Sequence, residues 1–474
     1  MRTERVHIVG GGLAGCEAAW QLAERGIAVT LHEMRPTRTT PAHRTDRLAE
    51  LVCSNTFKST EPTNAHGLLK AEMRVLGSLV LTAADEARVP GGTALAVDRD
   101  AFAAAMTARV TGHPRIEVER GEVTVIPRPG IVATGPLTSD ALATTLRDRL
   151  DAAGGDPGGD PGGDRGGDRP RETLAFYDAI APVVDVESLD RAVVFRASRY
   201  GKETMPAVPD VQAAAGPDGA AEGAYLNCPF TREEYEAFLA ALIAADQHQG
   251  HAFDAAPYFE GCLPVEVMAS RGPDVLRFGP LKPVGLVDPR TGRRPYAVAQ
   301  LRQEDRAGRM WNLVGFQTRL RIPEQQRVFR MIPGLAAAEF LRYGSIHRNS
   351  YVNTPAVLTP YLALRDDPLV LLAGQITGVE GYTESAATGL IAGLNLARLL
   401  DGDPPLVPPP TTMLGALYRY LRDADPRHFQ PMNANFGLLD DLAEPIRDKR
   451  RKRERFAERA LEAIEVWHRR PVHV

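Results

Sequence analysis

Cysteine is scarce in this chain of 474 residues, which contains four: Cys16, Cys53, Cys228 and Cys262. None belongs to a Cys-x-x-Cys pair or to a zinc-ligand spacing, so we expect neither a disulfide framework nor a bound metal. Aromatic residues make up 6% of the chain, which disfavours a binding surface built mainly on base stacking. No apolar run approaches the roughly 20 residues of a membrane-spanning helix. The first residues lead into a strand without an apolar signal segment, so we expect a cytoplasmic protein with no membrane partner.

An excess of one charge sign is also missing, because the formal net charge is −4. With 44% hydrophobic and 24% charged residues, the composition is typical of a globular enzyme. Any contact with nucleic acid must therefore come from a local basic patch. The strongest such patch, from Arg447 to Arg459, has eight basic and three acidic residues within a helix predicted over 445–468. It is suited to contact phosphates, although a solvated helix face tied by ion pairs is the alternative.

The N-terminal residues form a dinucleotide-binding pattern. An apolar strand over 6–9, a glycine loop, a helix over 16–23 and a second strand over 27–31 make one βαβ unit. In the loop, Gly10 permits the tight turn, Gly12 lets a pyrophosphate approach the backbone, and Gly15 lets the helix pack on the strand. Glu33, near the tip of the second strand, is expected to accept hydrogen bonds from ribose hydroxyls. The predicted dinucleotide-binding residues are Gly10, Gly11, Gly12, Leu13, Ala14, Gly15 and Glu33.

A second strand-to-helix segment lies late in the chain. An apolar strand over 369–373 leads into a glycine-containing turn over 374–385 and a helix over 386–400. A helix that begins near Thr383 would point its N-terminus at a flavin ring and favour negative charge there. This favours FAD over NAD and adds Gly378, Gly381 and Tyr382 to the predicted cofactor site. The alternatives are that the two glycines merely shape a turn and that Tyr382 packs as an ordinary aromatic residue.

These patterns predict an α/β protein in which a Rossmann-like FAD/NAD(P)-binding domain, formed by N- and C-terminal segments, holds an inserted α+β domain. Residues 151–172 are a low-complexity repeat of Gly, Asp and Pro, typical of a flexible surface insert. The predicted division is residues 1–150 for the first part of the FAD-binding domain, 151–172 for the flexible insert, 173–324 for the inserted substrate domain, 325–430 for the second part of the FAD-binding domain, and 431–474 for a basic helical extension.

Several short blocks spread over most of the chain are more specific than these patterns. They are Gly10 to Trp20, Glu33 to Pro36, Thr40 to His43, Ala49 to Asn55, Tyr225 to Pro229, Phe259 to Pro264, Arg277 to Pro283, His347 to Asn349 and Gly374 to Ser385. Together they resemble the TrmFO family of folate- and FAD-dependent tRNA (uracil-5-)-methyltransferases. The related MnmG (GidA) flavoproteins lack the Cys-Ser-Asn and Asn-Cys-Pro blocks in this arrangement. The stretches 151–172 and 203–223 look longer than is usual in the family.

The resemblance implies that 5,10-methylenetetrahydrofolate supplies a carbon unit and that FAD, reduced by NAD(P)H, supplies the reducing equivalents. The implied product is 5-methyluridine at position 54, in the T loop of tRNA. The resemblance also implies two catalytic cysteines, Cys53 and Cys228. Uracil C5 becomes a carbon nucleophile once a thiolate has added at C6. We expect Cys228 to be that thiolate, with its pKa lowered by a helix that starts near Thr231, and Cys53 to be a base or the alternative nucleophile.

Two other functions remain open at this point. The same chemistry on a uridine of rRNA would require the same catalytic residues. A flavin-bound RNA-binding protein without catalytic activity is the other alternative, although such a protein has no need for two positioned thiols.

Overall fold

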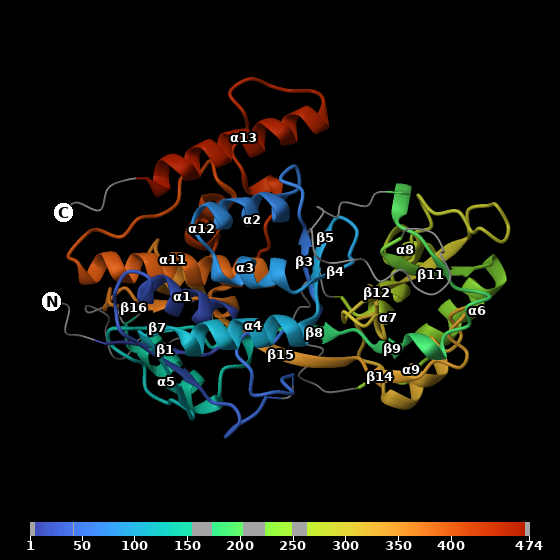
Figure 1. Ribbon diagram of the computed structural model, residues 1–474, viewed down its shortest axis with the longest axis horizontal. Helices are drawn as coiled ribbons and strands as arrows, with labels where there is room; N and C mark the ends of the chain where they lie inside the picture. The colour runs from blue at the N-terminus through green and yellow to red at the C-terminus, as the bar shows by residue number, and fades with distance from the viewer. Residues whose placement is uncertain (1–4, 41, 154–172, 202–222, 249–262, 470–474) are drawn as a thin grey trace, which may run out of the picture.

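The computed structural model describes residues 5–40, 42–153, 173–201, 223–248 and 263–469, and shows two lobes (Figure 1). Each lobe has its own apolar core. Apart from its first three residues, which end α5 (Asp140–Ala153), the predicted insert at 151–172 lies outside the described residues, as does Cys262.

The larger lobe is built on a five-stranded sheet in the order β16–β7–β1–β2–β6. Every neighbouring pair is parallel. The last strand in sequence, β16, therefore lies beside strands from the first third of the chain, which confirms a Rossmann-like domain made of N- and C-terminal segments. The strands are β1 (Val6–Val9), β2 (Val29–Glu33), β6 (Ile116–Arg120), β7 (Gly130–Val132) and β16 (Val370–Leu372).

Two helices of this lobe pack closely against each other. α1 (Leu13–Ala23) follows β1, and α11 (Tyr382–Leu400) follows β16 (Figure 1). Glycine permits the contact, because a Cβ on Gly389 of α11 would lie 2.2 Å from the carbonyl oxygen of Ala14. Both helices follow parallel strands, so their N-termini meet at the carboxyl edge of the sheet.

The sequence pattern over 65–81 predicts a single helix, but the structure has two, α2 (Ala65–Val75) and α3 (Leu79–Glu86). Gly77 separates them with φ of +75°, a conformation that favours glycine. Ser78 then caps α3 by accepting a hydrogen bond from the Leu81 N–H. Buried Glu17 of α1 accepts further bonds from the first N–H groups of α3, so the break also fixes α3 against α1.

The C-terminal part of the chain packs on the larger lobe. Buried Glu72 of α2 accepts hydrogen bonds from the N–H groups of Met413 (2.7 Å) and Leu414 (2.8 Å), at the start of α12 (Met413–Asp423). The helix predicted over 445–468 is confirmed as α13 (Lys449–His468), which lies along α2 at the top of Figure 1. Five of its residues are buried in the core of this lobe: Phe456, Ala457, Ala460, Ile464 and Trp467. Helix α13 is thus an integral layer of the larger lobe.

The smaller lobe contains a six-stranded antiparallel sheet in the order β10–β11–β12–β13–β9–β14. β14 still belongs to this sheet, so the chain returns to the larger lobe later than residue 325, where the sequence suggested the boundary. The strands are β9 (Val183–Asp185), β10 (Phe195–Arg196), β11 (Tyr225–Phe230), β12 (Ala297–Gln303), β13 (Met310–Leu313) and β14 (Phe340–Arg342). The helices are α6 (Arg232–Ile243), α7 (Val265–Ser270), α8 (Val275–Phe278) and α9 (Ile322–Phe329).

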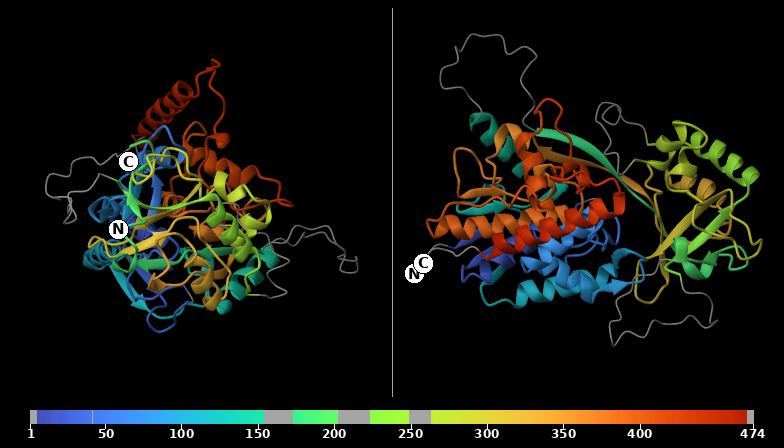
Figure 2. Two further views of the ribbon diagram at one scale, coloured as in Figure 1. Left: turned by 90° about the vertical axis from the view of Figure 1, so that its right-hand side faces the viewer. Right: turned by 90° about the horizontal axis from the view of Figure 1, so that it is seen from above.

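A long antiparallel ribbon links the two lobes. It pairs β8 (Thr173–Ile180) with β15 (Ser345–Val352), and Figure 2 shows both strands running from one lobe to the other. A three-stranded sheet of β3 (Thr56–Ser59), β5 (Ala94–Val97) and β4 (Arg88–Val89) lies next to the boundary, followed by α4 (Arg99–Gly112). Short helix α10 (Thr354–Val357) follows the ribbon.

Candidate functional site

An open cavity with an empty volume of about 1040 Å³ lies at the carboxyl edge of the parallel sheet. This edge, where helices α1 and α11 begin, is the usual place for a nucleotide in such folds. The wall is formed by segments that are far apart in sequence, mainly Gly10–Ala14, His32–Arg35, Thr40, His43, Glu50, Ala133–Ser139, Gly374, Gln375, Tyr382 and Ser385.

The glycine loop fits a dinucleotide pyrophosphate. Gly10 has φ of +110°, and a Cβ there would lie 2.4 Å from the Ala133 carbonyl oxygen. A Cβ on Gly15 would lie 1.8 Å from the Gly10 carbonyl oxygen, so Gly15 serves the packing of α1 rather than the cavity wall. Gly12 has no protein atom within 4 Å of its hypothetical Cβ and lines the cavity. The N-terminus of α1 is therefore open to an anionic group.

Glu33 lies at the end of β2, as the sequence predicted, and lines the same cavity. One carboxylate oxygen accepts a hydrogen bond from the Gly11 N–H (3.1 Å). The guanidinium of Arg35, a residue that no motif predicted for the site, donates to both oxygens (2.9 and 3.1 Å). Burial opposes ionisation of Glu33, but Arg35 outweighs it and lowers the pKa of the carboxyl. Glu33 is thus held as a carboxylate acceptor, suited to ribose hydroxyls.

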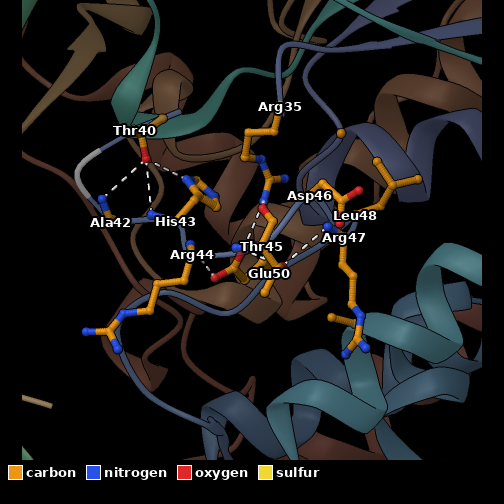
Figure 3. Close-up of polar contacts among 12 residues, drawn as sticks. Arg35, Thr40, Ala42, His43, Arg44, Thr45, Asp46, Arg47, Leu48 and Glu50 are labelled. Carbon is orange, nitrogen blue, oxygen red and sulfur yellow. Dashed lines mark hydrogen bonds and ion pairs between the residues drawn. The ribbon is translucent and has the colours of Figure 1, made fainter. Parts of the chain in front are cut away.

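Thr40, His43 and Glu50 form one side of the cavity, and Figure 3 shows the polar contacts around them. Glu50 accepts hydrogen bonds from the Thr45 N–H (3.0 Å) and from Arg35 (3.0 Å). Thr40 accepts bonds from the N–H groups of Ala42 and His43. Arg35 therefore ties Glu50 to Glu33, and the cavity wall is held by contacts among its own residues.

The opposite side comes from the segment after β16. Gly374, Gln375, Tyr382 and Ser385 line the cavity, whereas Gly378 and Gly381 do not. Gly378 has φ of +84° and packs against Phe429, and Gly381 has φ of +122° directly before α11. These two predicted cofactor residues therefore shape the turn that aims the N-terminus of α11 at the cavity.

Tyr382 connects the cavity to Cys53. Its phenol oxygen accepts hydrogen bonds from the N–H groups of Cys53 (2.7 Å) and Ser54 (3.0 Å). Cys53 and Tyr382 are 329 positions apart in the sequence. The pKa of Tyr382 is raised by burial and by the neighbouring Cys53. Arg99 donates to the Cys53 carbonyl oxygen (3.1 Å) from the other side. The partly exposed Cys53 is thus held directly beside the cavity.

Cys228 lies elsewhere, in the middle of β11 opposite Ala299. It is fully buried in the apolar core of the smaller lobe, and burial raises its pKa well above the ordinary value. The expectation that a helix N-terminus lowers this pKa is therefore wrong. The expected helix is present as α6. Its N-cap, Thr231, follows the last residue of β11, whereas Cys228 lies inside that strand.

Comparison with known proteins agrees with this geometry. The profile of the family described as Glucose inhibited division protein A matches residues 5–404. A protein of Geobacter sulfurreducens named methylenetetrahydrofolate–tRNA-(uracil-5-)-methyltransferase TrmFO is 54% identical over 467 residues, covering 98% of this chain and 99% of its own. One of the same name from Desulforudis audaxviator is also 54% identical over 467 residues, covering 98% of each chain. The chain belongs to the TrmFO family.

Solved structures show the same fold at much lower sequence identity. Two crystal forms of GidA from Aquifex aeolicus give TM-scores of 0.66 and 0.65, at 16% and 17% identity. The alignments cover 98% of this TrmFO-family chain and 73% and 75% of GidA. The arrangement of a sheet domain with an inserted lobe is therefore common to both.

Two features are absent from the described part of this TrmFO-family chain. Among the residues placed by the structure, no three His, Cys, Asp or Glu side chains gather as metal ligands. Within the same residues, no helix has both the length and the apolar character needed to traverse a bilayer.

Proposed function

We propose that this protein methylates uracil C5 of uridine 54 in the T loop of tRNA, with 5,10-methylenetetrahydrofolate as carbon donor and FAD, reduced by NAD(P)H, as reductant. The observation that carries the proposal is the 54% identity, over nearly the whole chain, to proteins named for this reaction. Support comes from Cys53, which Tyr382 holds beside a dinucleotide-type cavity.

The chain's own residues suit FAD in this cavity. The backbone at Gly11 and Gly12 would bind the pyrophosphate, Glu33 the ribose, and the N-terminus of α11 would face the ring system. When bound, the reduced flavin supplies the electrons that convert the transferred methylene group into a methyl group. Tyr382 and Ser385 lie where α11 begins, so they would orient that end of the cofactor.

Cys53 is the thiol that we assign to the attack on C6. It is partly exposed and beside the cavity, whereas Cys228 is enclosed in an apolar core. A thiolate that adds to C6 moves the C5–C6 electron pair towards the C4 carbonyl and makes C5 nucleophilic. The target base must leave its stack for this step.

A labelled-folate assay tests the proposal. The purified protein is incubated with unmodified tRNA transcript, NADPH and methylenetetrahydrofolate labelled in the transferred carbon, followed by nucleoside analysis. We expect labelled 5-methyluridine in this transcript and none in a control transcript with cytidine at position 54. Label in rRNA but not tRNA would support the rRNA alternative, and absence of label from both would support a non-catalytic RNA-binding protein.

The exposed basic end of α13 is the surface that we assign to the tRNA backbone. Its buried side anchors the helix to the larger lobe, which leaves Lys449, Arg451 and Arg453 exposed. Such residues contribute salt-dependent affinity without reading sequence.

Changing Lys449, Arg451 and Arg453 together to Gln tests this surface. We expect weaker tRNA binding, with the slope of log K against log salt reduced by about 0.9 for each phosphate that the variant no longer neutralises. Binding is measured by filter retention at several salt concentrations, with Glu462→Gln, exposed on the same helix, as the control. An unchanged slope in the triple variant would assign the RNA surface to another part of the molecule.

A further inference from the structure

Three arginines from separate elements lie near the loop of Cys53 and Asn55, at the boundary between the lobes. Arg99 begins α4 of the larger lobe, Arg302 lies in β12 and Arg342 ends β14 of the smaller lobe. Arg99 and Arg302 donate hydrogen bonds to Cys53 and Asn55, which belong to one loop, and Arg342 lies near enough to Arg99 and Cys53 to interact with them electrostatically. The cluster therefore lies beside the loop that carries the thiol of the proposed function, and it joins the two lobes there.

One carboxylate lies within this cluster, and Arg99 engages it. Glu304 is buried, and its two oxygens lie 2.5 Å from Arg99 Nε and 3.2 Å from Arg99 Nη2. Arg99 also donates to the carbonyl oxygens of Leu51 (2.8 Å) and Cys53 (3.1 Å). Its guanidinium is thus committed to holding Glu304 and the Cys53 loop.

The other two arginines have no carboxylate at bonding distance among the described residues. Arg302 is buried and donates from Nε to the Asn55 side-chain oxygen (2.9 Å). For Arg342, Nε and Nη2 are both buried, and neither has a hydrogen-bond partner in the part of the chain that the structure describes. Burial, and then the charge of Arg99, lower the pKa of Arg342 to about 10, so the group remains a cation at neutral pH.

A buried cation with unpaired donors is destabilising, because the lost hydration is not replaced. Such a group is expected where the unpaired donors serve a ligand. A phosphate carries its full charge before any reaction, so pairing with Arg342 would stabilise bound RNA equally in the ground state and in the transition state. A planar uracil ring enters uncharged, and its charge develops only when the thiolate adds.

We propose that Arg342 is a catalytic residue that donates hydrogen bonds to O4 of the target uracil while Cys53 adds to C6. The proposal rests on the proposed function. The Sγ–C6 bond forms, the C5–C6 electron pair moves to C4–C5, and the C4=O4 pair becomes a negative charge on O4. No external electron donor or acceptor is needed for this addition. Donors placed at a developing oxyanion in a low-dielectric site stabilise the transition state more than the ground state.

The test compares Arg342→Gln and Arg342→Lys with wild type. We expect Arg342→Gln to lower kcat about 10²- to 10³-fold, with the KM values for tRNA and folate changed little. Arg342→Lys should recover part of this loss because it keeps a cationic donor. The urea midpoint of Arg342→Gln should stay the same or rise, since an unpaired buried charge has been removed. A merely structural role predicts a fall.

A direct readout uses tRNA with 5-fluorouridine at the target position. The hydrogen at C5 of uridine is removed as a proton before the enzyme is released, but fluorine at C5 cannot be removed in this way, so the covalent adduct persists. Adduct formation on denaturing gels should slow in Arg342→Gln by the same factor as kcat. The control is Arg330→Gln, at an exposed arginine of the same lobe, which should behave as wild type.

Three results would overturn the assignment: unchanged kcat and adduct rate, a rise in the KM for tRNA alone, or a rise in the KM for folate alone. The last two would indicate a ground-state contact with a phosphate or with a folate carboxylate. Wild-type protein that forms neither product nor adduct would instead refute the proposed function itself, and the role of Arg342 with it.

Discussion

Changing Cys53 to alanine is expected to reduce tRNA methylation about a thousandfold or more, because the nucleophile for C6 is lost. Flavin binding should be retained, since Cys53 does not line the cavity and its contacts with Tyr382 and Arg99 use backbone atoms. The measurement is single-turnover formation of 5-methyluridine, together with the flavin content of the purified variant. Cys53→Ser, with a much weaker nucleophile, should be impaired to a similar extent.

Cys16→Ala is the matched control for this experiment. Cys16 is fully buried on α1, and burial raises the pKa of its thiol well above the ordinary value. We expect its loss to leave the chemistry intact. A Cys53→Ala protein that keeps most of its activity, beside a Cys228→Ala protein that is folded and inactive, would instead assign the nucleophile to Cys228.

Changing Gly12 to valine is expected to produce a folded protein that does not retain flavin. The position has φ of −80° and ψ of −169°, an extended conformation that suits valine. Beyond Gly12 and its chain neighbours, no protein atom lies within 4 Å of the added Cβ, so the side chain enters the cavity where the pyrophosphate would approach the backbone. We expect flavin affinity to fall about a hundredfold or more, which corresponds to about 2.7 kcal/mol.

Flavin absorbance after purification, titration of the apoprotein with FAD and the urea midpoint together test this expectation. Gly112→Val, at the exposed end of α4 with open space around its Cβ, is the matched control and should keep its flavin. Normal flavin content in Gly12→Val would indicate that the dinucleotide binds away from the N-terminus of α1.

The parts of the fold that the sequence predicted are those with local causes. The first βαβ unit follows from an apolar run, a glycine turn and an acidic residue within about 30 positions. The apolar pattern predicted one helix across α2 and α3, although Gly77, a glycine inside a helical pattern, is a signal for a break. The lobe boundary was placed too early because the pairing of β14 with β9 joins residues more than 150 positions apart.

The site divides in the same way. Glu33 and the glycine loop were predicted from a motif, whereas Arg99 reaches Cys53 across 46 positions of sequence, through a tertiary contact that no short pattern records. For Cys228 a signal was present: Leu226, Cys228 and Phe230 alternate along β11 and all enter the apolar core. Period-two alternation is typical of a half-buried strand. The alternation of apolar residues therefore favoured a buried Cys228 thiol over a reactive one.

The position of β16 beside β7 has a consequence for biosynthesis. While a ribosome is still making the smaller lobe, the nascent chain has β1, β2, β6 and β7, but β7 has an unpaired edge. The cavity then also lacks the wall that contains Gly374, Gln375, Tyr382 and Ser385. Cofactor capture therefore waits until translation has passed α11, and a truncated product that ends before β16 has an open sheet edge and no complete place for a flavin.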